Sequence, residues 1–171
     1  MYRNELSSRA ILAFVFLVTV PTCVLATPSP KKPQRYYLPS AQGSRLVTVT
    51  KTGDAAREIT VLTEAIAVKE TGPNETVARF GEVYAFSPST IAVHRNQPTR
   101  ITFWNLQPDD EHDFALVASN LNIVMYVRLP PLKKTSYVFT FHDEGLFDFL
   151  CLRHQPEMGG QMLVLPAVAA P

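Results

Sequence analysis

Short runs of β-branched and aromatic residues, each followed by turn-forming residues, dominate the sequence from residue 46 onward. Valine, isoleucine, threonine, phenylalanine and tyrosine favour strands, whereas glycine, proline, asparagine and aspartate favour turns. Apolar and polar residues alternate in segments 100–105 and 136–141, so each segment can present one apolar face to a core. No long helical period accompanies them. This pattern predicts an all-β protein built from short strands.

Ten candidate strands fit between the turn signals, and their close spacing is typical of an antiparallel β-sandwich with Greek-key connections. They cover residues 46–50, 58–68, 79–86, 91–93, 100–105, 113–117, 123–127, 135–141, 146–151 and 161–165. A chain of this length has room for one such sandwich around one hydrophobic core. We therefore predict a single domain over residues 46–171.

The first 26 residues have the features of a secretory signal peptide. Arg3 and Arg9 lie in the leading part, residues 11–20 are apolar, and the segment 24–26 offers small or tolerated residues for cleavage. We therefore expect an exported protein, either periplasmic or secreted.

Two alternatives remain for this N-terminal segment. Cys23 could be the acylated residue of a lipoprotein, although Pro21 and Thr22 are poor neighbours for it. The segment could also stay uncleaved as an anchor, which would associate the protein with a membrane. Its apolar stretch is short for a spanning helix, however, and Pro21 interrupts it.

Residues 27–45 contain four prolines and several basic residues, a composition that favours a flexible, solvated linker. Without residues 1–26 the chain has equal numbers of basic and acidic residues, so it is formally neutral when its histidines are uncharged. Nucleic-acid-binding proteins are normally strongly basic. The sequence therefore predicts no nucleic-acid partner.

Cys151 is the only cysteine outside the predicted signal peptide. Cysteines in an oxidising compartment usually form disulfides, and the mature chain offers no second cysteine with which Cys151 could form one. One interpretation is a buried, inert core cysteine, because a free thiol behaves as a small hydrophobe. The other is a metal ligand. His154 and Met158 follow Cys151 closely and a strand-like segment precedes it, which favours the metal ligand.

His112 begins another apolar run, and a neighbouring strand could bring it alongside Cys151 and His154. Two imidazoles, one thiolate and a weak axial thioether are the ligands of electron-transfer copper sites. The sequence therefore contains the residues for one such site, with Met158 as the thioether.

The order of these segments resembles the cupredoxins, the small blue copper proteins, over about residues 80–166. Segment 86–93 is similar to the entry strand of the family, and segment 98–105 to the strand before its first histidine loop. His112-Asp113-Phe114 resembles the first ligand segment. Residues 145–165 resemble the ligand loop and closing strand, because Cys151, His154 and Met158 lie there between two strand-like runs.

The resemblance implies that His112, Cys151 and His154 are equatorial ligands of one type 1 copper ion and that Met158 is the axial ligand. It also implies that the protein carries single electrons between a donor and an acceptor redox protein, without a small-molecule substrate. Only four histidines exist in the chain, too few for multicopper catalysis, and no Ser-His-Asp or paired-carboxylate arrangement stands out. We therefore expect a protein that is not an enzyme.

Some details of the site stay open. Met162 competes with Met158 as the axial ligand, although its place after two glycines suggests a closing strand and a core role. An oxygen ligand from Glu157 or Glu111 would give a redder, more tetragonal site, like that of the nitrosocyanins. Asp113 stands where the family often has asparagine, and its carboxylate could orient the ligand loop or be solvated.

The acidic run Asp109, Asp110 and Glu111 beside His112 predicts a solvated loop, which could also steer a basic redox partner. Two other functions share the same sequence features. A copper carrier that delivers the ion to an oxidase would use the same ligands but release the metal readily. A cupredoxin-like interaction module would bind no metal.

Overall fold

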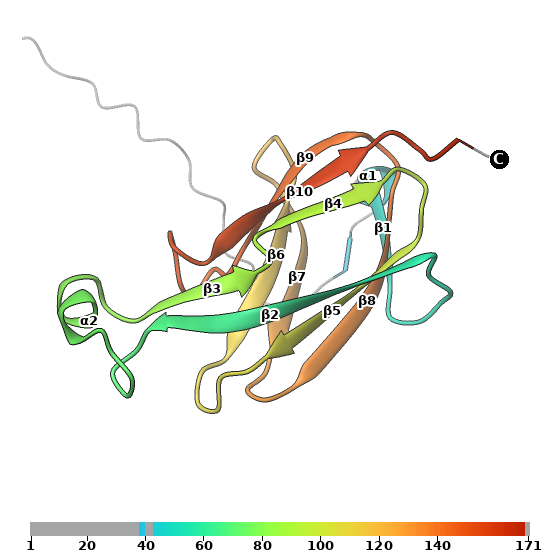
Figure 1. The fold of residues 1–171 in the computed structure, drawn as a ribbon. Helices are drawn as coiled ribbons and strands as arrows, with labels where there is room; N and C mark the ends of the chain where they lie inside the picture. The colour runs from blue at the N-terminus through green and yellow to red at the C-terminus, as the bar shows by residue number, and fades with distance from the viewer. Residues whose placement is uncertain (1–37, 40–42, 170–171) are drawn as a thin grey trace, which may run out of the picture.

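Two five-stranded sheets pack face to face in the computed structural model, which describes residues 38–39 and 43–169 (Figure 1). Along the chain the elements are α1 (Gly43–Leu46), β1 (Val47–Thr50), β2 (Arg57–Ala67), α2 (Asn74–Phe80), β3 (Val83–Ser87), β4 (Thr90–His94), β5 (Thr99–Asn105), β6 (His112–Val117), β7 (Ile123–Leu129), β8 (Lys134–Phe141), β9 (Gly145–Leu150) and β10 (Gly159–Leu165). One sheet has the order β1-β8-β5-β2-β3 and the other β4-β10-β9-β6-β7. The predicted β-sandwich is confirmed.

Each of the ten predicted strands overlaps one strand of the structure, and all ends but one agree within two residues. The exception is the start of β3. Arg79 and Phe80 belong to α2, so the prediction of a strand from residue 79 is wrong. This helix buries none of its residues and therefore has no apolar stripe that would reveal it. It ends at Gly81, whose φ of 83° is readily adopted only by glycine.

The strand directions are mixed. β2 pairs with β5 in parallel, and so does β4 with β10, whereas the other strand pairs are antiparallel. The alternation of apolar residues identifies the strand face that is buried but carries no information about the direction of a neighbour. The sequence therefore predicted the sandwich without these two parallel pairs.

Phenylalanines from both sheets meet between them and form the centre of the core. The ring centroids of Phe103 and Phe114 lie 4.4 Å apart, and those of Phe86 and Phe149 lie 5.5 Å apart. All four side chains are almost completely buried. Because side chains on a strand alternate between its faces, the residue two positions before Phe114 also faces inward, and so does the residue two positions after Phe149. Those residues are His112 and Cys151.

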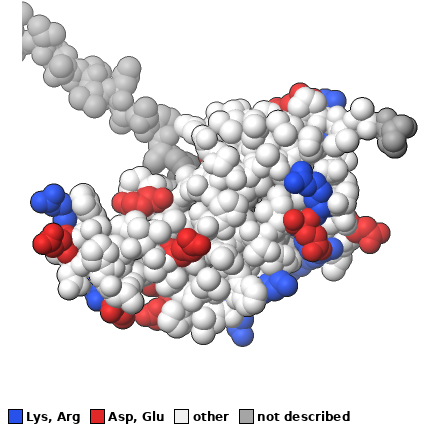
Figure 2. Space-filling view, in the orientation of Figure 1, with Lys and Arg blue, Asp and Glu red and all other residues white. Residues whose placement is uncertain are grey.

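Charged side chains of both signs are scattered around the margin of the face seen in Figure 2, with no extended patch of one sign. The helix α2 lies in the connection between β2 and β3 and projects from the sandwich (Figure 1). In the described residues, no helix is both long enough and apolar enough to cross a membrane. The predicted signal peptide and most of the predicted linker lie outside the described residues, whereas Gly43 to Arg45 at the end of that linker form part of α1.

Candidate metal centre

The antiparallel pairing of β6 with β9 brings three of the predicted ligands to one end of the sandwich. His112 is the first residue of β6, and Cys151 directly follows the end of β9. Ala115 lies opposite Leu150, so the start of β6 runs alongside the loop that follows β9. His154 lies on this loop, three residues after Cys151. Strand pairing therefore joins residues that are about 40 positions apart in the sequence.

The ligand atoms of these three residues face one another. Nδ1 of His112 lies 3.1 Å from Nδ1 of His154, and Sγ of Cys151 lies 3.5 Å from the His154 nitrogen and 4.0 Å from the His112 nitrogen. Two nitrogens at about 2.0 Å from a shared metal ion are roughly 3.3 Å apart in tetrahedral geometry, and a sulfur at about 2.3 Å lies roughly 3.5 Å from each. The three side chains therefore fit around a single ion.

The ligand loop between β9 and β10 is closed by its own backbone hydrogen bonds. The Cys151 N–H donates to the Met158 carbonyl at 2.9 Å, and the Met158 N–H donates to the His154 carbonyl at 2.9 Å. Met158 is completely buried, as are Cys151 and His112, while His154 is half-buried. The loop thus holds Cys151, His154 and Met158 beside His112 at the start of β6, and the ligand atoms of His112, Cys151 and His154 face one another.

Burial sets the protonation of the site. It raises the pKa of the Cys151 thiol to about 11, with a further contribution from the nearby Asp113 carboxylate. It also lowers the pKa of His112 to about 4, assisted by the neighbouring His154, whose own pKa burial lowers as well. At neutral pH the metal-free site therefore holds two neutral imidazoles, ready to bind a metal, and a thiol that must first lose its proton.

No protein-family model matches the sequence, and no curated protein sequence matches it either. Solved structures do match. A copper nitrite reductase from Nitrosomonas europaea superposes with a TM-score of 0.51 at 12% identity, over 67% of this chain and 51% of that one. A multicopper oxidase from Campylobacter jejuni superposes with a TM-score of 0.50 at 10% identity, over 66% of this chain and 31% of that one. Auracyanin A, a "blue" copper protein from Chloroflexus aurantiacus, superposes with a TM-score of 0.45 at 18% identity, over 63% of this chain and 98% of that one.

The chain has the cupredoxin fold. This confirms the fold that the resemblance of the sequence implied. The cluster of His112, Cys151 and His154 lies at one end of the cupredoxin sandwich and fits a single type 1 copper ion, because the donor set is two imidazoles and one thiol.

Asp113 links the two ligand segments of this cupredoxin fold. Its backbone N–H donates to the sulfur of Cys151 at 3.4 Å, and its carboxylate accepts the N–H of Leu152 at 2.5 Å. The carboxylate also faces the hydroxyl of Tyr126 at 3.4 Å and the guanidinium of Arg153 at 3.5 Å. Asp113 is completely buried, so of its two suggested roles the structure supports orientation of the ligand loop and excludes solvation.

Glu111 forms a second link across the site. Its carboxylate accepts from the guanidinium groups of both Arg128 and Arg153, the latter at 2.7 Å. Arg153 lies between Cys151 and His154 in the sequence, so this ion pair connects the loop before His112 with the ligand loop. The prediction of a solvated acidic run is therefore wrong for Glu111. The same ion pairs leave this carboxylate engaged with cations and disfavour it as a metal ligand.

Buried Asn105 fixes the loop that leads to His112. Its side-chain amide donates to the carbonyls of Asp110 and Leu129 at 2.8 and 2.9 Å, and its Oδ1 accepts from the hydroxyl of buried Thr63 at 2.8 Å. Satisfied buried polar groups of this kind rigidify a structure. Asn105 was not among the predicted site residues, since nothing in the sequence marks an asparagine at the end of a strand as more than a turn residue.

The strand register separates the two candidate axial methionines. Met162 lies on β10 opposite Phe147 and Ile91, inside the sandwich. Phe147 precedes Cys151 by four residues, which corresponds to about 13 Å along a strand. Met158 lies on the ligand loop itself and shares a backbone hydrogen bond with Cys151. Glu157 is exposed. This arrangement favours Met158 as the axial ligand.

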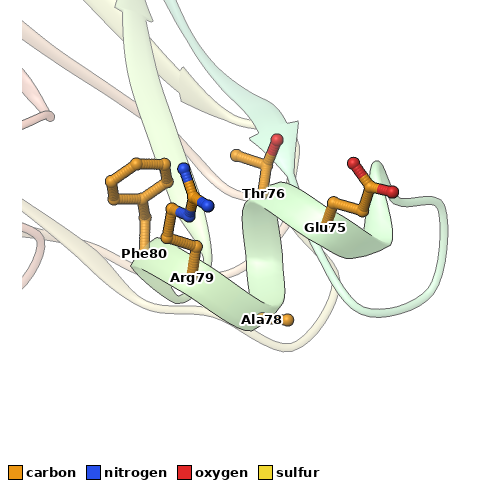
Figure 3. A pocket seen from close by; sticks show the side chains of 5 residues that line it. All are labelled: Glu75, Thr76, Ala78, Arg79 and Phe80. Carbon is orange, nitrogen blue, oxygen red and sulfur yellow. The ribbon is translucent and has the colours of Figure 1, made fainter.

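A hollow beside α2 contains none of the predicted ligands. Among the described residues it is lined by side chains of the helix itself, including Glu75, Arg79 and Phe80 (Figure 3). The hollow therefore adds no residue to the candidate metal centre.

Proposed function

We propose that the protein is an exported, mononuclear type 1 copper protein that carries one electron at a time between a donor and an acceptor redox protein. The observation that carries the proposal is the buried cluster in which Nδ1 of His112, Nδ1 of His154 and Sγ of Cys151 converge. These three residues are the proposed equatorial ligands. Met158 is the proposed axial ligand, because it lies on the same closed loop and is completely buried.

The ligand set suits one-electron chemistry. Bound copper would supply a one-electron redox couple, in which sulfur ligands favour Cu(I) and imidazoles accept either oxidation state. The protein's own contribution is rigidity, since the strand pairing, the Asp113 contacts and the Glu111 ion pairs hold the ligand segments together. A rigid site changes little when its charge changes, which suits electron transfer.

His154 is the proposed contact point for redox partners. The other three proposed ligands are completely buried, whereas His154 is half-buried. An electron that enters or leaves by the shortest route would therefore pass through its imidazole. The proposal includes no small-molecule substrate and no catalytic role.

Burial of the ligands also argues against a copper carrier. A carrier must hand its metal to an acceptor protein, which requires ligand exchange at an accessible site. Here Cys151 and His112 would have to move out of the core before an acceptor could replace them. Rapid loss of copper to a purified acceptor would nevertheless establish the carrier function instead.

Export is part of the proposal and rests on residues 1–26. The arginines, the apolar stretch and the small residues at its end support a signal peptide. The intact mass of the protein recovered from the exported fraction tests this. A mass that includes residues 1–26 would contradict cleavage.

The variant Cys151→Ser tests the ligand assignment. The wild-type protein is expected to bind one Cu(II) with an intense blue colour, and Cys151→Ser is expected to lose that colour because it removes the only proposed sulfur anion. His142→Gln is the matched control. His142 bonds to Thr48, apart from the cluster, so this variant should stay blue. An unchanged visible spectrum in Cys151→Ser would refute the proposal.

A further inference from the structure

Tyr84 of β3 packs against both histidines of the candidate site. Its ring centroid lies 4.8 Å from that of His112 and 4.7 Å from that of His154, and the two imidazole centroids are themselves 4.8 Å apart. The three rings therefore form a nearly equilateral triangle. Tyr84 is inclined to both imidazoles, by 67° and 55°, and only 2% of it is exposed.

Tyr84 comes from a different part of the fold than the ligands. β3 belongs to one sheet, whereas β6 and β9, which lead to His112 and Cys151, belong to the other. The backbone that carries the Tyr84 ring therefore lies outside the ligand loop. Its hydroxyl donates to the carboxylate of Asp110, two residues before His112. Tyr84 thus ties the opposite sheet to the loop that carries the first ligand.

The hydrogen bonding of His112 bears on what the Tyr84 ring does. A metal-binding histidine usually donates its second ring N–H to a carboxylate, carbonyl or water, which fixes the orientation of the imidazole. Nε2 of His112 is buried and has no hydrogen-bond partner among the described residues. A hydrogen bond at Nε2 therefore does not orient this imidazole in the described part of the chain. The side-chain contacts of His112 include those of its Nδ1 with His154 and Cys151 and the packing of the Tyr84 ring.

Packing alone does not require a tyrosine at this position. A phenylalanine would fill the same space without burying a hydroxyl, which needs a partner when it leaves water. Here the hydroxyl has such a partner, because it donates to the carboxylate of Asp110.

We propose that Tyr84 is a positioning residue that holds the imidazoles of His112 and His154 in ligand geometry before copper binds and keeps outside ligands away from the bound metal. This inference rests on the proposed copper site and goes one step further. Zinc sites that keep an open position serve catalysis, whereas closed zinc sites are structural. A tyrosine ring packed against both imidazoles would leave less room for an outside ligand at the metal.

The first test uses the metal-free, full-length protein and does not depend on copper. Nuclear magnetic resonance of the wild type should give one narrow set of imidazole signals for His112 and His154, with short-range magnetisation transfer from the Tyr84 ring to both. Imidazoles that sample several orientations in the wild type would overturn the proposal. Tyr84→Leu should broaden or split the imidazole signals. Tyr84→Phe, which keeps the ring and loses the bond to Asp110, should give a smaller change.

The second test adds Cu(II) and then azide, a small anion that binds open copper positions. The wild-type visible and electron paramagnetic resonance spectra should not respond to azide, whereas those of Tyr84→Leu should shift. Tyr137→Leu is the control for loss of a buried tyrosine. Tyr137 lies on β8, which β5 and β2 separate from β3, so this variant should lose stability but remain insensitive to azide.

The outcomes separate the two proposals. If copper-loaded Tyr84→Leu resists azide as the wild type does, the shielding role of Tyr84 is wrong while the copper site stands. If the wild type binds no copper, the proposed function fails, and the metal-free spectra still decide whether Tyr84 holds the two imidazoles.

Discussion

At the scale of single residues, the proposed copper site requires Cys151 to lose its proton before it can bind a metal. Its raised pKa of about 11 keeps the thiol protonated at neutral pH, whereas the lowered pKa values of His112 and His154 keep both imidazoles neutral. A metal ion that binds the thiolate must therefore release one proton. The site gains affinity as the pH rises, because fewer protons compete with the metal.

This predicts the pH dependence of copper affinity. Between pH 7 and pH 9, which lies above the imidazole pKa values and below that of the thiol, the apparent Cu(I) affinity should rise about tenfold per pH unit. Competition with a chromophoric Cu(I) chelator of known pH dependence measures this. An affinity that does not change with pH would mean that Cys151 is not a ligand or is already ionised without metal.

Asp113 places a buried, negatively charged carboxylate beside the proposed copper ligands. Reduction adds one negative charge to the site, so the carboxylate charge opposes it. Asp113→Asn should therefore raise the reduction potential. Its Oδ1 can still accept the N–H of Leu152, so the geometry should be retained. Arg153 offsets part of the charge, and we expect an effect on the order of 1–3 kcal/mol. This equals roughly 40–130 mV for one electron.

Redox titration of the copper protein measures the effect of Asp113→Asn. The control is Asp148→Asn on β9, where the carboxylate accepts from the side chain of Gln161 on β10. This control should change the potential much less. A potential that falls in Asp113→Asn would contradict the assignment of a negative charge beside the metal.

At the scale of elements, β10 packs closely against Ser89 and Phe149, and this packing helps to position the ligand loop that precedes β10. A Cβ atom added to Gly160 would lie 2.2 Å from the backbone oxygen of Ser89 and 2.4 Å from the ring of Phe149. Only a glycine fits there. Since β10 begins directly after Met158, a shift of this strand would also move the end of the ligand loop.

Gly160→Ala should therefore destabilise the metal-free protein, by about 1–3 kcal/mol or more, as expected for overpacking against backbone. Urea denaturation followed by tryptophan fluorescence measures the change. Gly159→Ala is the neighbouring control. Its added Cβ would meet Leu150 at 3.1 Å and a backbone oxygen at 3.3 Å, so the cost should be smaller. Equal stability of Gly160→Ala and the wild type would show that β10 can move without loss.

The helices and strands differ in how well they could be predicted from the sequence. All ten strands could be located, because each is a short run rich in β-branched and aromatic residues between turn signals. The helix α2 could not, since a short helix with no buried face leaves no period. The parallel pairs escaped for another reason, because pairing direction depends on the path of the whole chain.

In the candidate site, only residues whose side-chain type itself indicates metal binding could be predicted from the sequence. A single cysteine near a histidine and a methionine is typical of a copper site, so His112, Cys151 and His154 could be predicted from the sequence as ligands, and the structure brings their ligand atoms together. Tyr84 and Asn105 were not. Each occupies an ordinary position in a strand, and its role depends on residues that only the folded chain brings near.

At the scale of the whole molecule, the two sheets act as a rigid frame for one end. The aromatic core joins the sheets, and the strands that carry His112 and Cys151 extend from it. The ligand segments are held by hydrogen bonds and ion pairs between protein groups. Such contacts would limit the movement of the proposed ligands during electron transfer.

The most direct test of this account is a titration of the purified protein with Cu(II), followed by one cycle of reduction and reoxidation under visible and electron paramagnetic resonance spectroscopy. We expect one copper per chain, an intense blue colour that disappears on reduction, and its full return on reoxidation. A protein that binds no copper, or binds it without the blue colour and without reversible reduction, would not be a type 1 copper protein.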